Sequence, residues 1–374
     1  MALSLRLAAF YFAFFAYSGA YVAWFPPYLA ARGLGAAEMA WVLALPPLTR
    51  IFAPAAWGWL ADRSGAQRAI VAFSCAANAA CFALLPFVEG FGAIALLMAV
   101  TSLLSAAALP LVEAITLAHL GGQQGKYGPI RLWGSIGFIA TVLGGGAWLD
   151  FQPIATLPAA LLAFSLATLA VALSLPGDTA QRGGPRAPLE LPSGAIALLG
   201  AGFFMAAAHG TLYVFLTLHL QRQGYSGSFI GFAWTLGVLA EIVVFLYLPA
   251  LFRRYALSLI LAASCALGVL RFLTIGWAAE LVWLLLVAQV LHAATFGAFH
   301  AAAVAAVHRV FPPQARGRGQ TLFSSVSYGA GGAAGAFAAG WAWEAAGAGF
   351  AFTVSALGAA AGLLLAYGVK RAGF

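Results

Sequence analysis

Long runs of apolar residues recur throughout this chain of 374 residues, and they constrain its fold more than any other feature. A helix that crosses the hydrocarbon core of a bilayer needs about 20 consecutive, mostly apolar residues. The chain is 63% hydrophobic and only 7% charged, whereas soluble domains carry about 25% charged residues. The sequence therefore predicts an all-α membrane protein with no room for a sizeable soluble domain.

Twelve apolar runs, separated by charged, Pro-rich or Gly-rich breaks, are the expected transmembrane helices. They cover residues 7–30, 38–60, 68–88, 92–119, 132–150, 154–176, 194–219, 228–252, 256–277, 282–309, 319–342 and 349–369. The break at 177–193 is the only polar linker rich in both Pro and Gly. It divides the chain into an N-terminal six-helix bundle, 1–176, and a C-terminal six-helix bundle, 194–374.

Basic residues in the loops predict the orientation, because cytoplasmic loops carry an excess of Lys and Arg. Fourteen Lys and Arg fall on the side that holds both termini and the linker, and only Arg32 and Arg222 fall on the other. Both termini are therefore expected in the cytoplasm and the protein in a plasma (inner) membrane. Sixteen of the 18 basic residues are Arg, which favours a bacterial source. The net charge of +8 then reflects topology, so no nucleic-acid partner is expected.

The two halves of the chain repeat each other weakly. The segment that begins at Tyr28 aligns with the segment that begins at His219, at an offset of 191 residues that is close to half the chain. Two six-helix halves related by a parallel repeat describe the major facilitator architecture, in which the substrate site lies near the bilayer midplane.

The loop between the second and third expected helices carries the most specific motif. It reads Gly58-Trp59-Leu60-Ala61-Asp62-Arg63-Ser64-Gly65-Ala66-Gln67-Arg68. This pattern resembles the loop signature of the major facilitator superfamily, from which only Gln67 departs. The resemblance implies that the loop gates the cytoplasmic side. Gly58 is expected to permit close helix contact, Gly65 to form a tight turn, and Asp62 to face an arginine or the positive end of a helix.

Three further motifs, at 127–135, 236–241 and 291–296, resemble the 3-phenylpropionate transporter branch, which is similar to nucleoside–proton symporters. The resemblance implies proton-coupled uptake of a small organic, aromatic carboxylate-like substrate by alternating access. A symporter of nucleosides or sugars, and an exporter of the same fold, stay open as alternatives. No cofactor is expected beyond the coupling proton, and the protein is expected to act as a monomer.

Four ionisable residues fall inside expected helices: Arg50, Glu113, Glu241 and Arg271. An Arg or Asp at the bilayer centre costs about 2.5–3.5 kcal/mol, so these side chains should face a partner or a cavity. Arg50 and Glu241 occupy equivalent positions of the repeat, which allows an ion pair across the pseudo-twofold axis. One hypothesis has Glu241 carry the proton while Arg50 or Arg271 attracts a carboxylate. The alternative is a permanent ion pair that joins helices, and Glu113 is equally consistent with gating.

Histidine and tyrosine side chains complete the expected site. A histidine such as His209 or His292 can relay protons in a wet cavity or donate to an anionic substrate. Tyr17 and Tyr21 belong to an aromatic stripe on one helical face, which indicates either substrate contacts or a lipid-facing surface. Histidines at 292, 300 and 308 recur every eight residues rather than every four, so no metal site is expected.

Two patterns resemble parts of enzymes. Gly224-Tyr225-Ser226-Gly227 matches the Gly-x-Ser-Gly pattern of rhomboid-like intramembrane serine proteases, but Ser226 also suits helix capping in an outer loop. The segment 121–127 resembles a phosphate-binding loop, yet it lacks the Ser or Thr that should follow Lys126. A protease is therefore a remote alternative, and the chain is not expected to be an enzyme.

Overall fold

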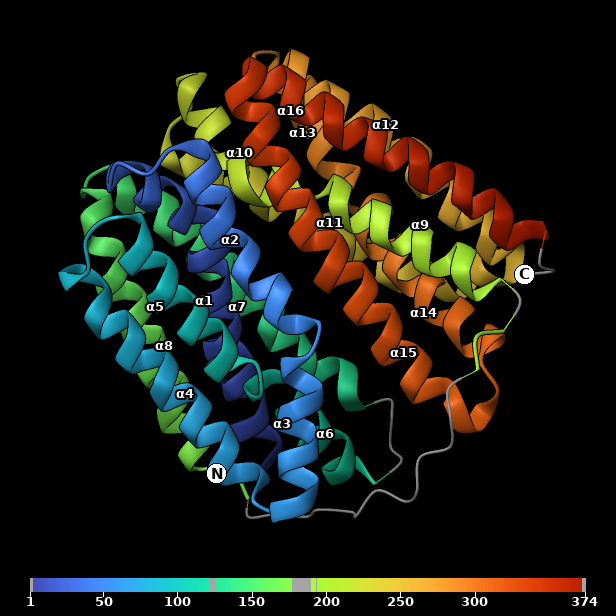
Figure 1. The fold of residues 1–374 in the computed structure, drawn as a ribbon, viewed down its shortest axis with the longest axis horizontal. Coiled ribbons are helices and arrows are strands. Elements are labelled where there is room, and N and C mark those ends of the chain that lie inside the picture. The colour runs from blue at the N-terminus through green and yellow to red at the C-terminus, as the bar shows by residue number, and fades with distance from the viewer. Residues whose placement is uncertain (1–2, 122–125, 177–189, 193, 372–374) are drawn as a thin grey trace. The chain divides into compact units, whose positions relative to one another are not determined.

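The computed structural model describes residues 3–121, 126–176, 190–192 and 194–371, and every regular element within these ranges is helical (Figure 1). Most of the expected linker at 177–193 lies outside the described residues. The first half of the chain contains α1 (Leu3–Ala31), α2 (Ala36–Arg50), α3 (Ala53–Ser64), α4 (Gln67–Leu84), α5 (Phe91–Ser105), α6 (Ala108–Leu120), α7 (Tyr127–Leu149) and α8 (Leu157–Leu173). The second half contains α9 (Ala195–Ala208), α10 (Gly210–Arg222), α11 (Gly227–Arg254), α12 (Leu257–Ala278), α13 (Val282–Val290), η4 (Ala293–Ala298), α14 (Phe299–Val310), α15 (Arg316–Ser324), η6 (Ser325–Gly331) and α16 (Gly332–Arg371).

Eleven continuous helical segments are long and apolar enough to cross a membrane, judged by length and composition. The last of them covers 57 residues, far more than the roughly 20 that one crossing needs. Its backbone leaves the helical conformation at Ala346 and Gly347, where the φ of Gly347 is +77°. This bend separates two spans, so the predicted all-α fold with twelve spans is confirmed.

The largest difference from the sequence-based helix boundaries lies at the start of the fifth expected span. The helix expected at 132–150 begins at Tyr127, which places Arg131 inside α7 rather than in a loop. Pro129 lies in the first turn of this helix, where the missing amide proton costs no hydrogen bond. A proline near the start of a helix is therefore a poor marker of its boundary.

The weak sequence repeat is visible in the backbone. Gly33 and Gly224 lie 191 residues apart and both have a φ of +82°, a conformation that glycine adopts without strain. The amide of Leu34 donates to the Leu29 carbonyl at 3.2 Å, and the amide of Tyr225 donates to the Leu220 carbonyl, also at 3.2 Å. The two helix ends are therefore built by the same hydrogen bond.

An acidic side chain binds the amide groups that follow each of these turns. Glu344 accepts from the amide of Ala37 at 2.8 Å. Asp150 accepts from the amides of Gly227 at 2.5 Å and Ser228 at 2.9 Å. Negative charge stabilises a helix N-terminus, so the repeat extends to the way in which α2 and α11 begin.

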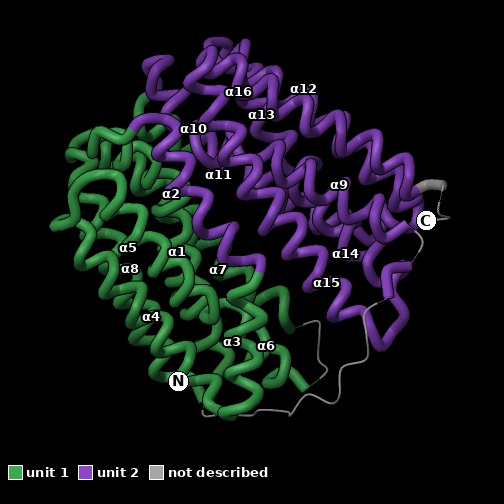
Figure 2. The backbone as a smooth tube through the Cα atoms, viewed as in Figure 1, with its two compact units in different colours: residues 1–34, 52–186, 226–232 green, residues 35–51, 187–225, 233–374 purple. Residues whose placement is uncertain are grey.

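The chain forms two compact units by backbone contacts, coloured separately in Figure 2. Unit 1 comprises residues 1–34, 52–186 and 226–232, and unit 2 comprises residues 35–51, 187–225 and 233–374. The short segments at 35–51 and 226–232 thus pack with the opposite half of the sequence. The division into bundles at 1–176 and 194–374 stays a prediction.

Close backbone approach explains where the two short segments pack. Within unit 1, a side chain on either Gly146 of α7 or Gly227 of α11 would collide with the backbone of the other. Within unit 2, a side chain on Gly340 of α16 would collide with Ala40 of α2. Small residues permit close packing where a membrane offers little hydrophobic driving force between helices.

Candidate functional site

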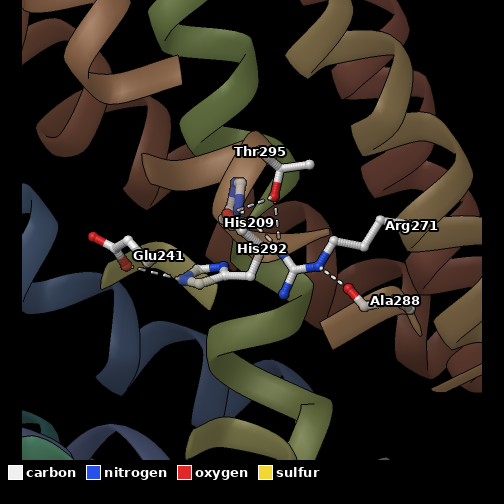
Figure 3. A network of polar contacts seen from close by, with 6 residues as sticks. All are labelled: His209, Glu241, Arg271, Ala288, His292 and Thr295. Atoms are coloured by element: carbon white, nitrogen blue, oxygen red, sulfur yellow. Dashed lines mark hydrogen bonds and ion pairs between the residues drawn. The ribbon is translucent and has the colours of Figure 1, made fainter. Parts of the chain in front are cut away.

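A fully buried arginine lies at the centre of unit 2. Arg271 of α12 is 1% exposed. Its Nε donates to the carbonyl of Ala288 at 2.9 Å, and its Nη1 donates to the hydroxyl of Thr295 at 3.0 Å (Figure 3). Nη1 also lies 3.3 Å from Nε2 of His209. Among the described residues, these hydrogen-bond partners bring no negative charge to the guanidinium.

The hydrogen bonds of His209 fix its protonation. A guanidinium carries donors only, so Nε2 of His209 must accept from Arg271. Nδ1 must then carry the ring proton, which it donates to the carbonyl of Met205 at 2.8 Å. His209 is therefore neutral in this structure, and both of its ring nitrogens are occupied. It lies at the junction of α9 and α10 and is 3% exposed.

A π-helical segment positions the third side chain of the network. Thr295 lies in η4, a π-helix that interrupts the tenth span between α13 and α14, and it is fully buried. Single turns of π-helix occur frequently at functional sites. Thr295 is not among the site residues predicted from sequence, although its spacing from His292 predicts that both lie on one helical face.

Glu241 of α11 extends the network. Its Oε2 lies 3.6 Å from Nε2 of His292, and the two side chains are 18% and 12% exposed respectively. The imidazole of His292 stacks on the ring of Phe296, with centroids 5.1 Å apart, and lies 6.1 Å from that of His209. The structure thus brings together four of the predicted site residues, because Glu241, His292, His209 and Arg271 form one chain of contacts (Figure 3).

Glycines make room for the Glu241–His292 pair. A Cβ on Gly297 would lie 2.9 Å from Cγ of Glu241, which is closer than packed carbons approach. A Cβ on Gly237 would lie 3.3 Å from Cβ of His292. The sequence did not predict a role for either glycine in the site, because a glycine in an apolar helix does not show which side chain packs against it.

Arg50 belongs to the same unit. It is the last residue of α2 and is exposed. Arg50 and Glu241 both lie within electrostatic range of the hydroxyls of Tyr213 and Tyr328. Arg271 is within range of Tyr213 as well. Three of the four charged residues predicted for the site, Arg50, Glu241 and Arg271, therefore lie within electrostatic range of Tyr213.

Glu113 belongs to a different cluster, in unit 1. It lies on α6, half-buried, within electrostatic range of Tyr11 and Tyr127. The guanidinium of Arg131 lies 4.0 Å from the ring centroid of Phe15 in the same region. The cluster joins α1, α6 and α7, and its role as a gate stays a prediction.

Tyr17 and Tyr21 pack their rings against α4. The centroid of Tyr17 lies 5.4 Å from that of Phe82, and Tyr21 stacks on Phe25 at 4.7 Å. The Tyr21 hydroxyl is buried and has no hydrogen-bond partner among the described residues. Tyr17 also lines a small polar cavity together with Asn78. Their role as substrate contacts stays a prediction.

The signature loop shows one of the features expected from the sequence. Gly65 ends α3 with a φ of +69°, and its amide donates to the carbonyl of Ala61 at 2.9 Å, so the predicted tight turn is confirmed. Arg68 donates to the carbonyl of Leu173, and Arg63 lies over the ring of Trp59 at 5.6 Å.

The expected close helix contact at Gly58 stays a prediction. Within unit 1, no described atom lies within 4 Å of the position that a Cβ on Gly58 would take. Asp62 is half-buried on the same helix.

The protease-like pattern forms a capped turn. Gly224 has a φ of +82°, and the hydroxyl of Ser226 accepts from the amide of Phe229 at 3.2 Å, as a helix N-cap does. Among the described residues, no group of three or more His, Cys, Asp or Glu is placed to hold a metal ion.

Comparison with known proteins identifies the family. The chain matches the model of the MFS_1 like family over residues 4–354. It is 31% identical over 207 residues to a "Probable 3-phenylpropionic acid transporter" of Escherichia coli (strain K12), covering 52% of this chain and 53% of that protein. It is 26% identical over 343 residues to a maltose permease of Geobacillus stearothermophilus, covering 86% and 83%. The match to the Escherichia coli protein thus spans about half of that protein's length.

Solved structures agree on the fold. A crystal structure of the nucleoside transporter NupG matches with a TM-score of 0.83 at 20% identity, covering 100% of this chain and 99% of the other. A D-xylose-proton symporter matches with a TM-score of 0.75 at 12% identity, covering 98% of this chain and 97% of the other. The chain belongs to the MFS_1 like family and is therefore a multi-pass membrane transporter of the major facilitator superfamily, not an enzyme.

Proposed function

We propose that this protein imports a small organic anion together with protons, and that the network around Arg271 is its coupling site. The observation that carries the proposal is the buried guanidinium, whose hydrogen-bond partners among the described residues bring no negative charge. A buried charge is costly unless it is paired and hydrogen-bonded. A substrate carboxylate would supply the missing negative charge.

The geometry leaves part of the guanidinium available. Nε and Nη1 make the contacts with Ala288, Thr295 and His209. Figure 3 shows the remaining nitrogen pointing away from Thr295 and Ala288. Arginine presents donors in a rigid fork that suits a carboxylate. The neutral dipoles therefore hold the fork in place, and an anion would bind at the remaining nitrogen once the buried side chain is uncovered.

Glu241 is the proposed proton carrier. It is the acidic member of the network, and its partial exposure allows protons to reach it. A deprotonated Glu241 attracts His292 and the nearby arginine charges, whereas a protonated Glu241 does not. Binding and release of the proton therefore alter the electrostatic field at the anion site, which is the requirement for coupling.

Alternating access follows the family architecture, in which the two repeats rock about a midplane site. We place the protein in the plasma membrane with both termini in the cytoplasm, acting as a monomer. A monoanion carried with one proton moves no net charge, so the pH gradient alone would drive it. The membrane potential contributes about 2.3 kcal/mol per 100 mV for each net charge moved.

A neutral substrate is the second candidate. Relatives include a maltose permease and the structural neighbour NupG, a nucleoside transporter. A sugar or nucleoside would use its hydroxyl groups with Thr295 and the histidines and would leave Arg271 as a structural cation.

Uptake into proteoliposomes tests these candidates. Labelled 3-phenylpropionate, maltose and a nucleoside would each be measured with and without an inward proton gradient. We expect gradient-dependent accumulation of the aromatic acid. We expect Arg271→Gln to lower its uptake roughly 10- to 100-fold, because a hydrogen bond to a charged group contributes about 1.5–3 kcal/mol.

Arg253→Gln provides the matched control, because Arg253 is an exposed residue near the end of α11. Uptake of maltose or the nucleoside alone would overturn the anion proposal and leave the family unchanged. Gradient-driven movement in the opposite direction would identify an exporter. Equal losses in the Arg271 and Arg253 variants would remove Arg271 from the site.

A further inference from the structure

Unit 1 contains a small polar cavity that the proposed function does not use. Its volume is about 60 Å³. Oxygen-bearing side chains from four spans line it: Tyr17, Ser74, Asn78, Ser105, Ser165 and Thr168. No acidic or basic side chain is among the lining residues. Phe14, Cys75 and Ala108 also line it, so the cavity is neutral and combines hydroxyl and amide oxygens with apolar groups.

Three of the hydroxyl groups that line the cavity have already donated their only proton. Ser105 donates to the carbonyl of Thr101 at 2.7 Å, and Ser165 donates to that of Leu161 at 2.7 Å. Thr168 donates to the carbonyl of Phe164 at 2.8 Å. A hydroxyl has one proton and two lone pairs, so these oxygens can only accept further hydrogen bonds.

The acceptor role of the Ser165 hydroxyl also determines how the side-chain amide of Asn78 is oriented. The oxygen of Ser165 can only accept, so it is the Nδ2 of Asn78 that donates to it, at 2.8 Å. The amide oxygen of Asn78 therefore faces away from Ser165. It is buried, and no described atom lies in good hydrogen-bond geometry with it, although the Tyr17 hydroxyl lies close to the Asn78 side chain. The hydroxyl of Ser74 is also buried and lacks a partner within the described part of the chain. Asn78 is 7% exposed and Ser74 is fully buried.

An electropositive ligand suits this cavity, because the oxygens of Ser105, Ser165, Thr168 and Asn78 offer lone pairs and no protons, whereas only the hydroxyls of Tyr17 and Ser74 keep a proton. Hard cations bind carboxylate, carbonyl and water oxygens. Divalent Ca²⁺ and Mg²⁺ rely on carboxylates, none of which lines the cavity. One water molecule needs a cavity of about 10–15 Å³. A cavity of about 60 Å³ therefore accommodates a small ion with accompanying water.

We propose that this cavity is a binding site for Na⁺, held by the neutral oxygens of Asn78, Ser74 and the hydroxyl groups that surround them. The ion would link α4, which carries Ser74 and Asn78, to α8, which carries Ser165 and Thr168. The site lies within unit 1, so it is independent of the Arg271 network in unit 2. Its failure would leave the proposed transport function untouched.

Thermal unfolding of the purified full-length protein in detergent tests the site. Sodium chloride would replace choline chloride at constant ionic strength, with intrinsic tryptophan fluorescence as the readout and potassium chloride as a parallel series. We expect a saturable rise in Tm with Na⁺ and a smaller one with K⁺. Binding of ²²Na⁺ should saturate at one ion per protein.

Ser74→Ala is the sharpest variant, because the Ser74 hydroxyl has no hydrogen-bond partner to lose among the described residues. Its Tm in choline should equal or exceed that of the parent, while its affinity for Na⁺ should fall at least tenfold. Asn78→Ala should abolish the Na⁺ response. Ser264→Ala, at a buried serine of unit 2, should leave both the affinity and the response unchanged.

Three results would overturn the proposal. Equal Tm values in sodium and choline would indicate that the cavity holds only water. Equal responses to Na⁺ and K⁺ would indicate no sodium site. An Na⁺ response that survives in both Ser74→Ala and Asn78→Ala would place the ion elsewhere.

Discussion

The two units bury polar groups in opposite ways. Unit 2 buries a charge, Arg271, and satisfies it with the dipoles of Ala288, Thr295 and His209. Unit 1 buries a neutral cavity in which the Asn78 amide oxygen and the Ser74 hydroxyl lack partners among the described residues. Under the two proposals, the buried charge of unit 2 would bind an anion and the oxygens of unit 1 would bind a cation. Related halves of one fold would then serve ligands of opposite charge.

Among the variants that test this difference between the units, Glu241→Gln should have the largest effect on transport, because it removes the acidic group of the unit 2 network. We expect accumulation driven by the pH gradient to be abolished, while exchange of labelled for unlabelled substrate is partly retained. Both would be measured in proteoliposomes. Unchanged accumulation would exclude Glu241 from coupling, and a loss of both activities would point to a structural role.

Replacing Thr295 by Val tests the dipoles that hold the buried charge. The change is nearly isosteric but removes the acceptor of Arg271 Nη1. We expect kcat/KM for uptake to fall about tenfold, since a hydrogen bond to a charged group contributes about 1.5–3 kcal/mol. Thr295→Ser, which keeps the hydroxyl, should restore most of the activity. If Ser and Val variants lose the same activity, packing by the methyl group matters rather than the hydrogen bond.

Replacing Arg50 by Lys asks whether the exposed arginine of unit 2 also recognises an anion. Lys keeps the charge and loses the fork. We expect KM for an anionic substrate to rise roughly threefold, because an exposed ion pair contributes about 0.2–1 kcal/mol. The KM of a neutral analogue should change less. Competition by matched anionic and neutral compounds would measure this. Equal losses would indicate a structural arginine.

The smallest effect should come from Asp150, which caps α11 within unit 1. Hydrogen bonds from Ser228 and Gly227 lower the pKa of Asp150 below its ordinary value. Its stabilising effect should therefore be fully present above the pKa of an unfolded Asp and disappear as pH falls through the lower pKa of the folded state.

Comparison of Tm against pH for the parent and Asp150→Asn checks this expectation. The parent should be more stable at neutral pH, and the two curves should converge in acid. Since Asp150 is exposed, the difference should be small. Parallel curves across the whole range would show that the carboxylate does not act through its charge.

The sequence alone determined the features that depend on local composition and local backbone. Apolar runs of membrane-crossing length indicated twelve spans, and the bend at Ala346 and Gly347 is what separates the last two. A glycine at Gly65 predicted a tight turn, and the weak repeat predicted equivalent helix ends at Gly33 and Gly224. Such features can be read from sequence because hydrophobicity and a positive φ belong to single residues or short segments.

Only the tertiary structure decided which side chains meet. Arg271, His209 and Thr295 come from three different spans, and no spacing along the chain predicts their contact. Thr295 was left out of the predicted site because its spacing from His292 indicates a shared helical face but not a contact with Arg271. Packing between helices is set by the shapes of distant surfaces, and that information is spread over the whole chain.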